Sequence, residues 1–155
     1  MSLEGKPAPA FELAGSDGRM HSLKEYVGRT VIIYFYPRDN TPGCTKEACG
    51  FRDHHQSLTS LDAVVLGVSK DSLKSHDKFI ADFNLPFVLL SDPEAKMMAT
   101  YGAFGEKVMY GKKTTGIIRS TVVIGPDGKV VRHWPKVAKA EDHPAAVLDF
   151  LQQQK

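Results

Sequence analysis

Short runs of consecutive apolar residues alternate, along the first two thirds of the chain, with longer segments in which apolar residues recur at helical spacing. The runs are TVIIYFY at residues 30–36, AVVLGVS at 63–69 and a third at 87–90. Continuous apolar runs of this length, rich in Val, Ile and aromatic residues, predict strands that are buried on both faces.

The segments between these runs predict helices. Residues 44–61 have the length of one helix, and residues 71–84 carry apolar residues at helical spacing behind a candidate cap at Asp71 or Ser72. A short helix is expected from Pro93 to about Tyr101. Strands that alternate with helices indicate parallel strands joined by crossover connections.

The last third of the chain has a different pattern. Residues 120–134 form two β-rich runs around the turn sequence Pro-Asp-Gly, and residues 140–154 predict a closing amphipathic helix. A parallel βαβ unit followed by a hairpin and a helix is the arrangement of a thioredoxin-like fold. We therefore expect an α/β chain with a mixed central sheet flanked by helices and an N-terminal extension, forming one domain over residues 1–155. The glycine-rich residues 101–116 are predicted to be the longest loop.

Composition narrows the class of protein. The 155 residues are 42% hydrophobic and 25% charged, and the 20 basic and 18 acidic side chains are scattered along the chain. This balance argues against a disordered protein and against a nucleic-acid-binding surface. Acidic residues and prolines stand near the start, where a signal peptide needs a continuous apolar stretch, and no segment has the length of a membrane span. The expectation is a soluble, cytoplasmic protein that does not bind membranes.

The two cysteines of the chain stand five positions apart at the predicted start of a helix. Thr41 occupies the expected N-cap position, Pro42 the first helical position and Cys44 the third. Backbone N–H groups of a first turn lack intrahelical acceptors and favour an anion, so the Cys44 thiolate is stabilised there. The Thr41 hydroxyl can either cap the helix or bond the neighbouring sulfur, and Pro37 can close one wall of the pocket.

The spacing of Cys44 and Cys49 restricts their chemistry. In an intact helix, five residues give a rotation of about 140° and a rise of about 7.5 Å, which sets the α-carbons about 8.7 Å apart. A disulfide normally needs less than about 7 Å, so the first turns must unwind before the two sulfurs can bond. Gly50 is a poor helix former and makes that unwinding less costly.

Other roles for the cysteines stay open from the residues alone. Both can be small buried apolar residues, or they can bind zinc together with His54 and His55, although adjacent histidines on a helix point about 100° apart. The other histidines form no cluster in the sequence, and we expect them to be solvated surface residues: His21, His76, His133 and His143.

The segment YPRDNTPGCTKEACGFRD, residues 36–53, resembles the active-site segment of the peroxiredoxins. The signature of that family is Pro-x-x-x-Thr-x-x-Cys, matched here by Pro37, Thr41 and Cys44. The second cysteine and the later segment FGEKVMYGKKTTGIIRST, residues 104–121, are similar to the bacterioferritin comigratory protein, or Q-type, branch. The resemblance extends over nearly the whole chain.

The resemblance implies a thiol peroxidase that serves in antioxidant defence and redox homeostasis. Cys44 would be the peroxidatic cysteine, Thr41 would orient the peroxide, Pro37 would shield the thiolate and Arg119 would supply positive charge. Donors aimed at the oxygens where charge develops are what thiolate attack on an O–O bond requires. Glu47, one helical turn after Cys44, either forms an ion pair with Arg119 or is an ordinary solvated side chain.

By the same resemblance, Cys49 is the resolving cysteine, which condenses with the Cys44 sulfenic acid to an intramolecular disulfide. The substrates would be hydrogen peroxide and organic hydroperoxides, and thioredoxin or glutaredoxin would reduce the disulfide. No metal, flavin or haem cofactor is implied. Because both thiols lie in one chain, the default expectation is a monomer.

Two rival functions make different predictions. A thioredoxin-like disulfide reductase uses a Cys-x-x-Cys motif, which the chain lacks. A non-catalytic binding module would keep its function when Cys44 is replaced by serine, whereas a peroxidase would lose all peroxide reduction.

Overall fold

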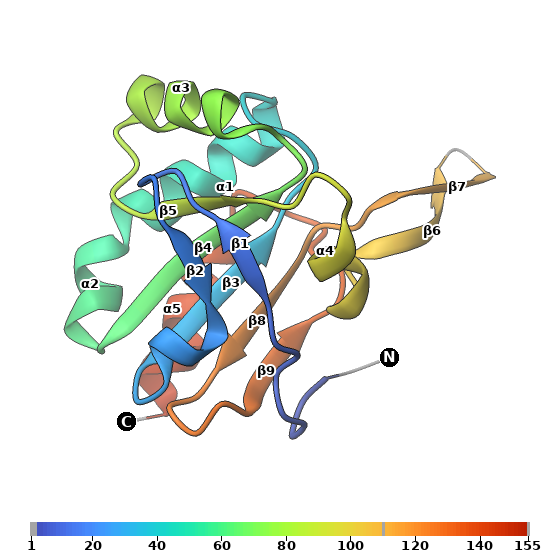
Figure 1. Ribbon diagram of the computed structural model, residues 1–155. Helices are drawn as coiled ribbons and strands as arrows, with labels where there is room; N and C mark the ends of the chain where they lie inside the picture. The colour runs from blue at the N-terminus through green and yellow to red at the C-terminus, as the bar shows by residue number, and fades with distance from the viewer. Residues whose placement is uncertain (1–2, 110, 155) are drawn as a thin grey trace.

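The computed structural model describes residues 3–109 and 111–154 and is shown in Figure 1. The strands are β1 (Glu12–Ala14), β2 (Met20–Ser22), β3 (Thr30–Phe35), β4 (Ala63–Ser69), β5 (Val88–Ser91), β6 (Phe104–Met109), β7 (Lys112–Ile117), β8 (Ser120–Ile124) and β9 (Val130–Trp134). The helices are the 3₁₀ helix η1 (Leu23–Tyr26) and the α-helices α1 (Pro42–Asp53), α2 (His55–Ser60), α3 (Leu73–Phe83), α4 (Lys96–Thr100) and α5 (His143–Gln153).

The central sheet has the strand order β5-β4-β3-β8-β9. β3 is parallel to β4 and β4 to β5, whereas β8 is antiparallel to both β3 and β9. The three apolar runs are therefore parallel strands joined by helical crossovers, and the β8–β9 hairpin completes a mixed sheet. Both features confirm the thioredoxin-like arrangement predicted from the sequence.

Both faces of the sheet are covered, because the side chains of β3 alternate between two hydrophobic clusters. One cluster takes Ile32 and Tyr34 and is closed by apolar residues of α1, α2, α3 and α5. The other takes Val31, Ile33 and Phe35 and is closed by α4 and the N-terminal segment. Figure 1 shows the short β1–β2 hairpin and α4 on the opposite side of the sheet from α1 and α5.

Two helices differ from the sequence prediction. The single helix expected over residues 44–61 is two helices, α1 and α2, which meet at His54, where φ is −97° and ψ is 3°. The helix expected from Pro93 begins only at Lys96. Ala95 has a positive φ of 57°, and the Asp92 carboxylate accepts from the backbone N–H groups of Lys96 and Met98, which fixes the later start.

The prediction of a loop over residues 101–116 is wrong, because most of this segment is the β6–β7 hairpin. Figure 1 shows this hairpin projecting from the body of the molecule. Cross-strand pairs such as Glu106 opposite Thr115 set its register, and Gly111 turns the chain with a φ of 78°. The glycines of this segment suggested a loop, although its β-branched residues favour extended backbone. Tyr110, within the same segment, lies outside the described residues.

The prediction that four histidines are solvated is also wrong. All four are buried, with exposed fractions between 0% and 5%: His21, His76, His133 and His143. Each ring has a polar partner that makes burial tolerable, and these partners come from Asp17, Asp39, the backbone N–H of Leu3, and Thr121. The sequence showed no cluster because most of these partners are distant along the chain.

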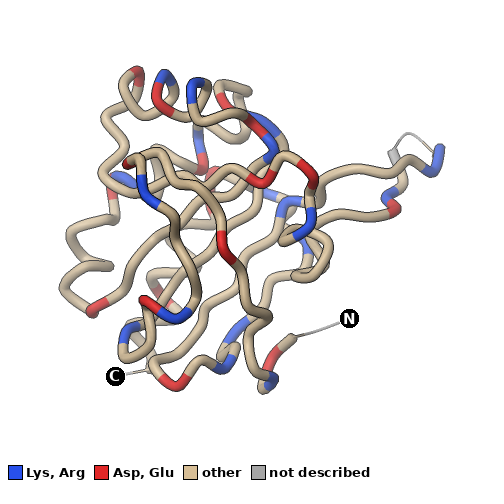
Figure 2. The backbone as a smooth tube through the Cα atoms, in the orientation of Figure 1, with Lys and Arg blue, Asp and Glu red and all other residues tan. Residues whose placement is uncertain are grey.

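Charged side chains of both signs occur together on the outer elements. In Figure 2, α3 and the β6–β7 hairpin each carry basic and acidic positions. Within the described residues, none of the helices is both long and apolar enough to cross a bilayer.

Candidate active site

The loop between β3 and α1 delivers Cys44 to the start of a helix, as the sequence predicted. Thr41 is the N-cap residue in extended conformation and Pro42 is the first residue of α1, so Cys44 is the third. The Thr41 hydroxyl donates to the carbonyl of Arg38 at 2.9 Å and does not cap the helix. The unpaired N–H groups of the first turn therefore favour negative charge near Cys44.

Arg119 reaches the same point from the segment between β7 and β8. Its Nη2 atom lies 3.2 Å from Sγ of Cys44, and its Nη1 atom lies 2.7 Å from Oε1 of Glu47. A Cβ atom at Gly43 would stand 3.2 Å from Nη2, so glycine leaves room for the guanidinium. Cys44 is 1% exposed, and the guanidinium places a positive charge directly beside its sulfur.

Glu47 is fully buried and is not the solvated side chain that the sequence left open. Burial raises the pKa of its carboxyl to about 7, although the Arg119 guanidinium favours the ionised form and opposes the shift. Its Oε2 atom has no hydrogen-bond partner within residues 3–109 and 111–154. The ion pair with Arg119 fixes the orientation of the guanidinium.

A groove on the protein surface leads to this arginine. It has a volume of 520 Å³, and its walls include Pro37, Ile117, Arg119 and Val137. A smaller cavity of 290 Å³ is also lined by Arg119, together with charged residues that include Lys46. Pro37 is thus placed beside the guanidinium, in a position to wall the pocket.

Cys49 lies on the same helix as Cys44, partly buried, and both are free thiols. α1 is continuous through both positions, so the two sulfurs are held in the separated arrangement that the spacing predicted. A Cβ atom at Gly50 would lie 2.7 Å from Cγ of Pro144. The glycine therefore permits close packing of α1 on α5, a role that the sequence did not indicate.

One buried acidic residue of the loop was missed by the sequence reasoning. Asp39 is 6% exposed and forms a hydrogen bond with the fully buried His76 of α3, with 2.7 Å between Oδ2 and Nδ1. The only signal in the sequence was its place within the segment that carries Pro37 and Thr41. No group of three or more candidate metal ligands occurs in the described part of the chain.

Comparison with known proteins places these residues in context. The profile of the AhpC/TSA family matches residues 5–133. The chain is 49% identical to a putative peroxiredoxin bcp of Coxiella burnetii over 97% of its length and all of that protein. It is 46% identical to peroxiredoxin Bcp of Bacillus subtilis, over 97% of the chain and 96% of that protein.

Solved structures of peroxiredoxins are also similar to this chain. Peroxiredoxin Q of Xanthomonas campestris is 41% identical and superposes with a TM-score of 0.87, over 92% of this chain and 90% of that one. A second structure is of the bacterioferritin comigratory protein of Xanthomonas campestris, described for its alkyl peroxide reduction activity. It is 40% identical, with a TM-score of 0.87 over 93% of this chain and 91% of that one.

Proposed function

We propose that this chain, which belongs to the AhpC/TSA family and is a peroxiredoxin of the Bcp or Q type, reduces hydroperoxides with Cys44 as its peroxidatic cysteine. Enzymes of this family are thiol peroxidases. The observation that carries the assignment is the contact of Arg119 Nη2 with Cys44 Sγ, 3.2 Å long, in the first turn of α1. Cys49 has no such contact and is the resolving cysteine.

In the first step, the Cys44 thiolate attacks one oxygen of the hydroperoxide and the O–O bond breaks. The other oxygen leaves as an alcohol or as water after taking up a proton, and Cys44 becomes a sulfenic acid. Arg119 and the N–H groups of the first turn face the oxygens where negative charge develops. Thr41 orients the peroxide, and Pro37 shields the thiolate from solvent.

In the second step, the Cys49 thiol attacks the sulfenic sulfur, water leaves and a disulfide forms. The intact α1 holds the two α-carbons about 8.7 Å apart, beyond the roughly 7 Å that a disulfide tolerates. The first turns of α1 must therefore unwind in each cycle and refold after reduction. This requirement keeps the thiols apart until chemistry at Cys44 has occurred.

The groove beside Arg119 supports organic hydroperoxides as substrates in addition to hydrogen peroxide. Pro37, Ile117 and Val137 offer apolar surface where the tail of a hydroperoxide can lie while its O–O bond is at Cys44.

A dithiol protein reductant completes the cycle by exchange with the exposed disulfide, and thioredoxin, or glutaredoxin, fits that role. Both thiols of the cycle lie in one chain, so the monomer is the functional unit. Two unpaired cysteines and a reductant of this kind suit the reducing conditions of the cytoplasm.

The test is intact-mass analysis and free-thiol counting of the reduced protein before and after one equivalent of hydrogen peroxide. The proposal predicts loss of both thiols with the mass change of one disulfide. Cys44→Ser should consume no peroxide, whereas Cys49→Ser should consume one equivalent and then overoxidise Cys44. Two thiols that stay reduced in the wild type would reject the peroxidase assignment for this chain. Full thioredoxin-coupled turnover of Cys49→Ser would reject its resolving role.

A further inference from the structure

The strongest polar cluster outside the Cys44 site centres on the carboxylate of Asp39. Its Oδ1 atom accepts from the Tyr36 hydroxyl at 2.6 Å, and its Oδ2 atom accepts from the Ser75 hydroxyl at 2.9 Å. Nδ1 of His76 lies 2.7 Å from the same Oδ2 atom. Three groups, two of them on α3, thus converge on one buried carboxylate.

The His76 ring is fixed from both sides. Its Nε2 atom lies 2.9 Å from the carbonyl oxygen of Leu90 on β5, which can only accept a hydrogen bond. Its Nδ1 atom faces the Asp39 carboxylate, so both ring nitrogens have an oxygen within hydrogen-bond distance. The ring therefore connects the loop to the central sheet with no freedom to rotate.

The backbone of Asp39 is held as well. Its N–H donates to Oδ2 of Asp71 at 2.8 Å, and that oxygen also accepts from the hydroxyl of Ser69 at 2.8 Å. The carbonyl of Asp71 accepts from the hydroxyl of Ser91. Side chain and backbone of Asp39 are thus attached to the carboxyl ends of β4 and β5.

These contacts fix the middle of the loop that carries the site. Asp39 stands two residues after Pro37 and two before Thr41, and the next residue, Asn40, has a strained φ of 62°. The loop between β3 and α1 spans residues 36–41, and such backbone needs external contacts to keep one conformation. None of the contacts of Asp39 or His76 involves Cys44 or Arg119.

We infer that Asp39 and His76 are positioning residues for the peroxide reaction, which they support by holding Pro37 and Thr41 in place around Cys44. The inference rests on the proposed function. A displacement of about 1 Å in a reacting group lowers rates by about 100-fold, so loosening the loop should slow attack on peroxide. Thiolate formation at Cys44 depends on α1 and Arg119 and should not change.

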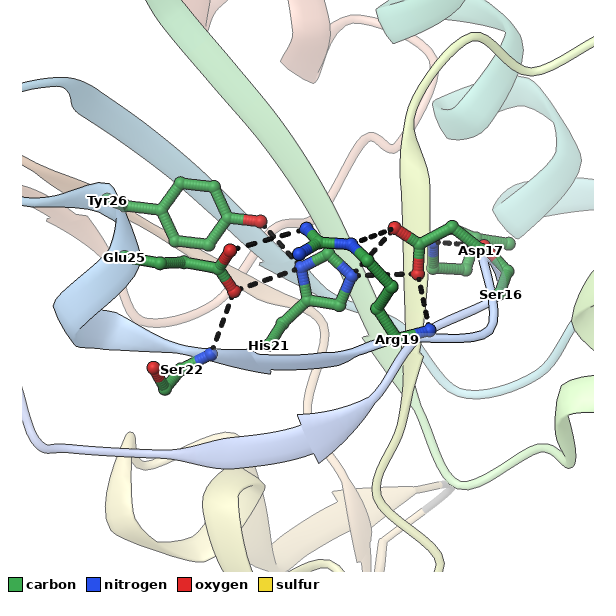
Figure 3. Close-up of polar contacts among 8 residues, drawn as sticks. Ser16, Asp17, Arg19, His21, Ser22, Glu25 and Tyr26 are labelled. Carbon is green, nitrogen blue, oxygen red and sulfur yellow. Dashed lines mark hydrogen bonds and ion pairs between the residues drawn. The ribbon is translucent and has the colours of Figure 1, made fainter.

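The chain offers a control in a second histidine–aspartate pair, in which the histidine is buried and the side chain of the aspartate is 34% exposed. Figure 3 shows His21 between Tyr26 and Asp17, with Nε2 2.8 Å from Asp17 Oδ1 and Nδ1 2.7 Å from the Tyr26 hydroxyl. His21 is 1% exposed and joins the β1–β2 hairpin to η1. Loss of this pair tests what removal of an aspartate from a buried histidine does by itself.

A conservative variant of Asp39 tests whether the residue acts through its hydrogen bonds or through its negative charge. In Asp39→Asn the amide oxygen can accept from Tyr36, and the amide nitrogen can donate to Ser75 and to His76, which then keeps its proton on Nε2 for the carbonyl of Leu90. All contacts of the cluster can be made without a carboxylate. If Asp39 acts through position, this variant recovers most of the rate.

The experiment compares the single-turnover rate constant for hydrogen peroxide with that for iodoacetamide, which the thiolate attacks with loss of iodide and without the need for an oriented O–O bond. For Asp39→Ala we expect the peroxide rate to fall by about 10- to 100-fold and the iodoacetamide rate to change by less than about threefold. Asp39→Asn should return to within about threefold of the wild type, and Asp17→Ala should react with peroxide at the wild-type rate. Should Asp39→Ala not fold, His76→Gln provides the same comparison with a smaller expected loss.

Equal peroxide rates for the wild type and for folded Asp39→Ala or His76→Gln would overturn the inference, as would a loss that Asp17→Ala shares. A parallel fall of both rates would assign Asp39 to thiolate formation and reject the positioning role. These results differ from failure of the proposed function, in which the wild-type protein itself would not react with peroxide.

Discussion

The Nη2 atom of Arg119 lies 3.2 Å from Sγ of Cys44, although 75 positions separate the two residues in sequence. The sulfur thus lies near positive charge from two parts of the chain, because the guanidinium adds hydrogen-bond donors to the N–H groups of the first turn of α1. The second nitrogen of the guanidinium is held by Glu47, so the fork of donors has one orientation. The chemistry of the first turn thus depends on a residue that follows β7.

Arg119→Ala should lower the second-order rate constant for hydrogen peroxide by about 100- to 1,000-fold, because one donor to the developing charge is lost. Arg119→Lys should recover only part of the rate, since one ammonium group cannot contact both Cys44 and Glu47 in fork geometry. Stopped-flow single turnovers provide the measurement. Arg132→Lys, at an exposed pair with Glu4, is the control and should react like the wild type. A wild-type rate in Arg119→Ala would contradict the assigned role.

Glu47 should make the protein less stable as pH rises. Its pKa is raised from 4.5 to about 7 by burial, so between these values the folded state keeps a proton that the unfolded state has lost. The free energy of unfolding then falls with rising pH, by up to about 3 kcal/mol over the window. Glu47→Gln should remove this fall in urea titrations from pH 4.5 to 7, whereas the exposed Glu106→Gln should not. Identical slopes for Glu47→Gln and the wild type would refute the prediction.

His143 should make the protein more stable as pH rises. Burial lowers its pKa from 6.5 to about 4, so between these values the unfolded state binds a proton that the folded state does not. This contribution to stability is complete above pH 6.5 and is lost, by up to about 3 kcal/mol, as pH falls through 4. As pH falls from 6.5 to 4, the free energy of unfolding of His143→Gln should therefore decrease less than that of the wild type. For each variant, the free energy of unfolding relative to the wild type can be plotted against pH. Slopes of the same sign for His143→Gln and Glu47→Gln would exclude this account.

A polar substitution in the groove should weaken the reaction with organic hydroperoxides more than the reaction with hydrogen peroxide. Val137→Ser places a hydroxyl on an apolar wall near Arg119, where a hydroperoxide tail would lie. We expect kcat/KM for cumene hydroperoxide to fall by about tenfold while the value for hydrogen peroxide stays near that of the wild type. Val131→Ser alters an exposed valine of β9 outside the groove and serves as the control. Equal losses for both peroxides in Val137→Ser would mean that the groove does not receive the substrate tail.

The order of strands and helices could be predicted from the sequence because each signal was local. The apolar run of β3 and the cap of α3 at Ser72 depend on a few adjacent residues, and the Ser72 hydroxyl does accept from the N–H of Ser75. Cys44 at the third position of α1 followed from Thr41 and Pro42 in the same way. Local rules thus place a residue on its element without reference to the rest of the fold.

What could not be predicted depends on residues brought together from distant parts of the chain. The four histidines look solvated in sequence, yet His76 is buried because Asp39, 37 positions away, provides a hydrogen-bond partner for its ring. The β6–β7 hairpin was missed since glycines within it resemble loop residues until the strands pair. Burial and cross-strand pairing are properties of the tertiary structure, and a single sequence does not display them.

Gly50→Ala offers a test of how α1 is held while its first turns unwind. Alanine has the higher helix propensity by about 1 kcal/mol, so on local grounds the variant should be more stable. The added Cβ atom would lie 2.7 Å from Cγ of Pro144, however, and must push α1 away from α5. Overpacking of this kind costs about 1–3 kcal/mol, so we expect a lower Tm, and a faster conversion of sulfenic acid to disulfide because α1 is less firmly seated. The double variant Gly50→Ala/Pro144→Ala removes the 2.7 Å contact with Cγ but keeps the Cβ atom of residue 144, 3.1 Å away, so it should restore part of the lost Tm. A Gly50→Ala protein with a higher Tm than the wild type would show that helix propensity outweighs packing, and that the contact with Pro144 does not control unwinding.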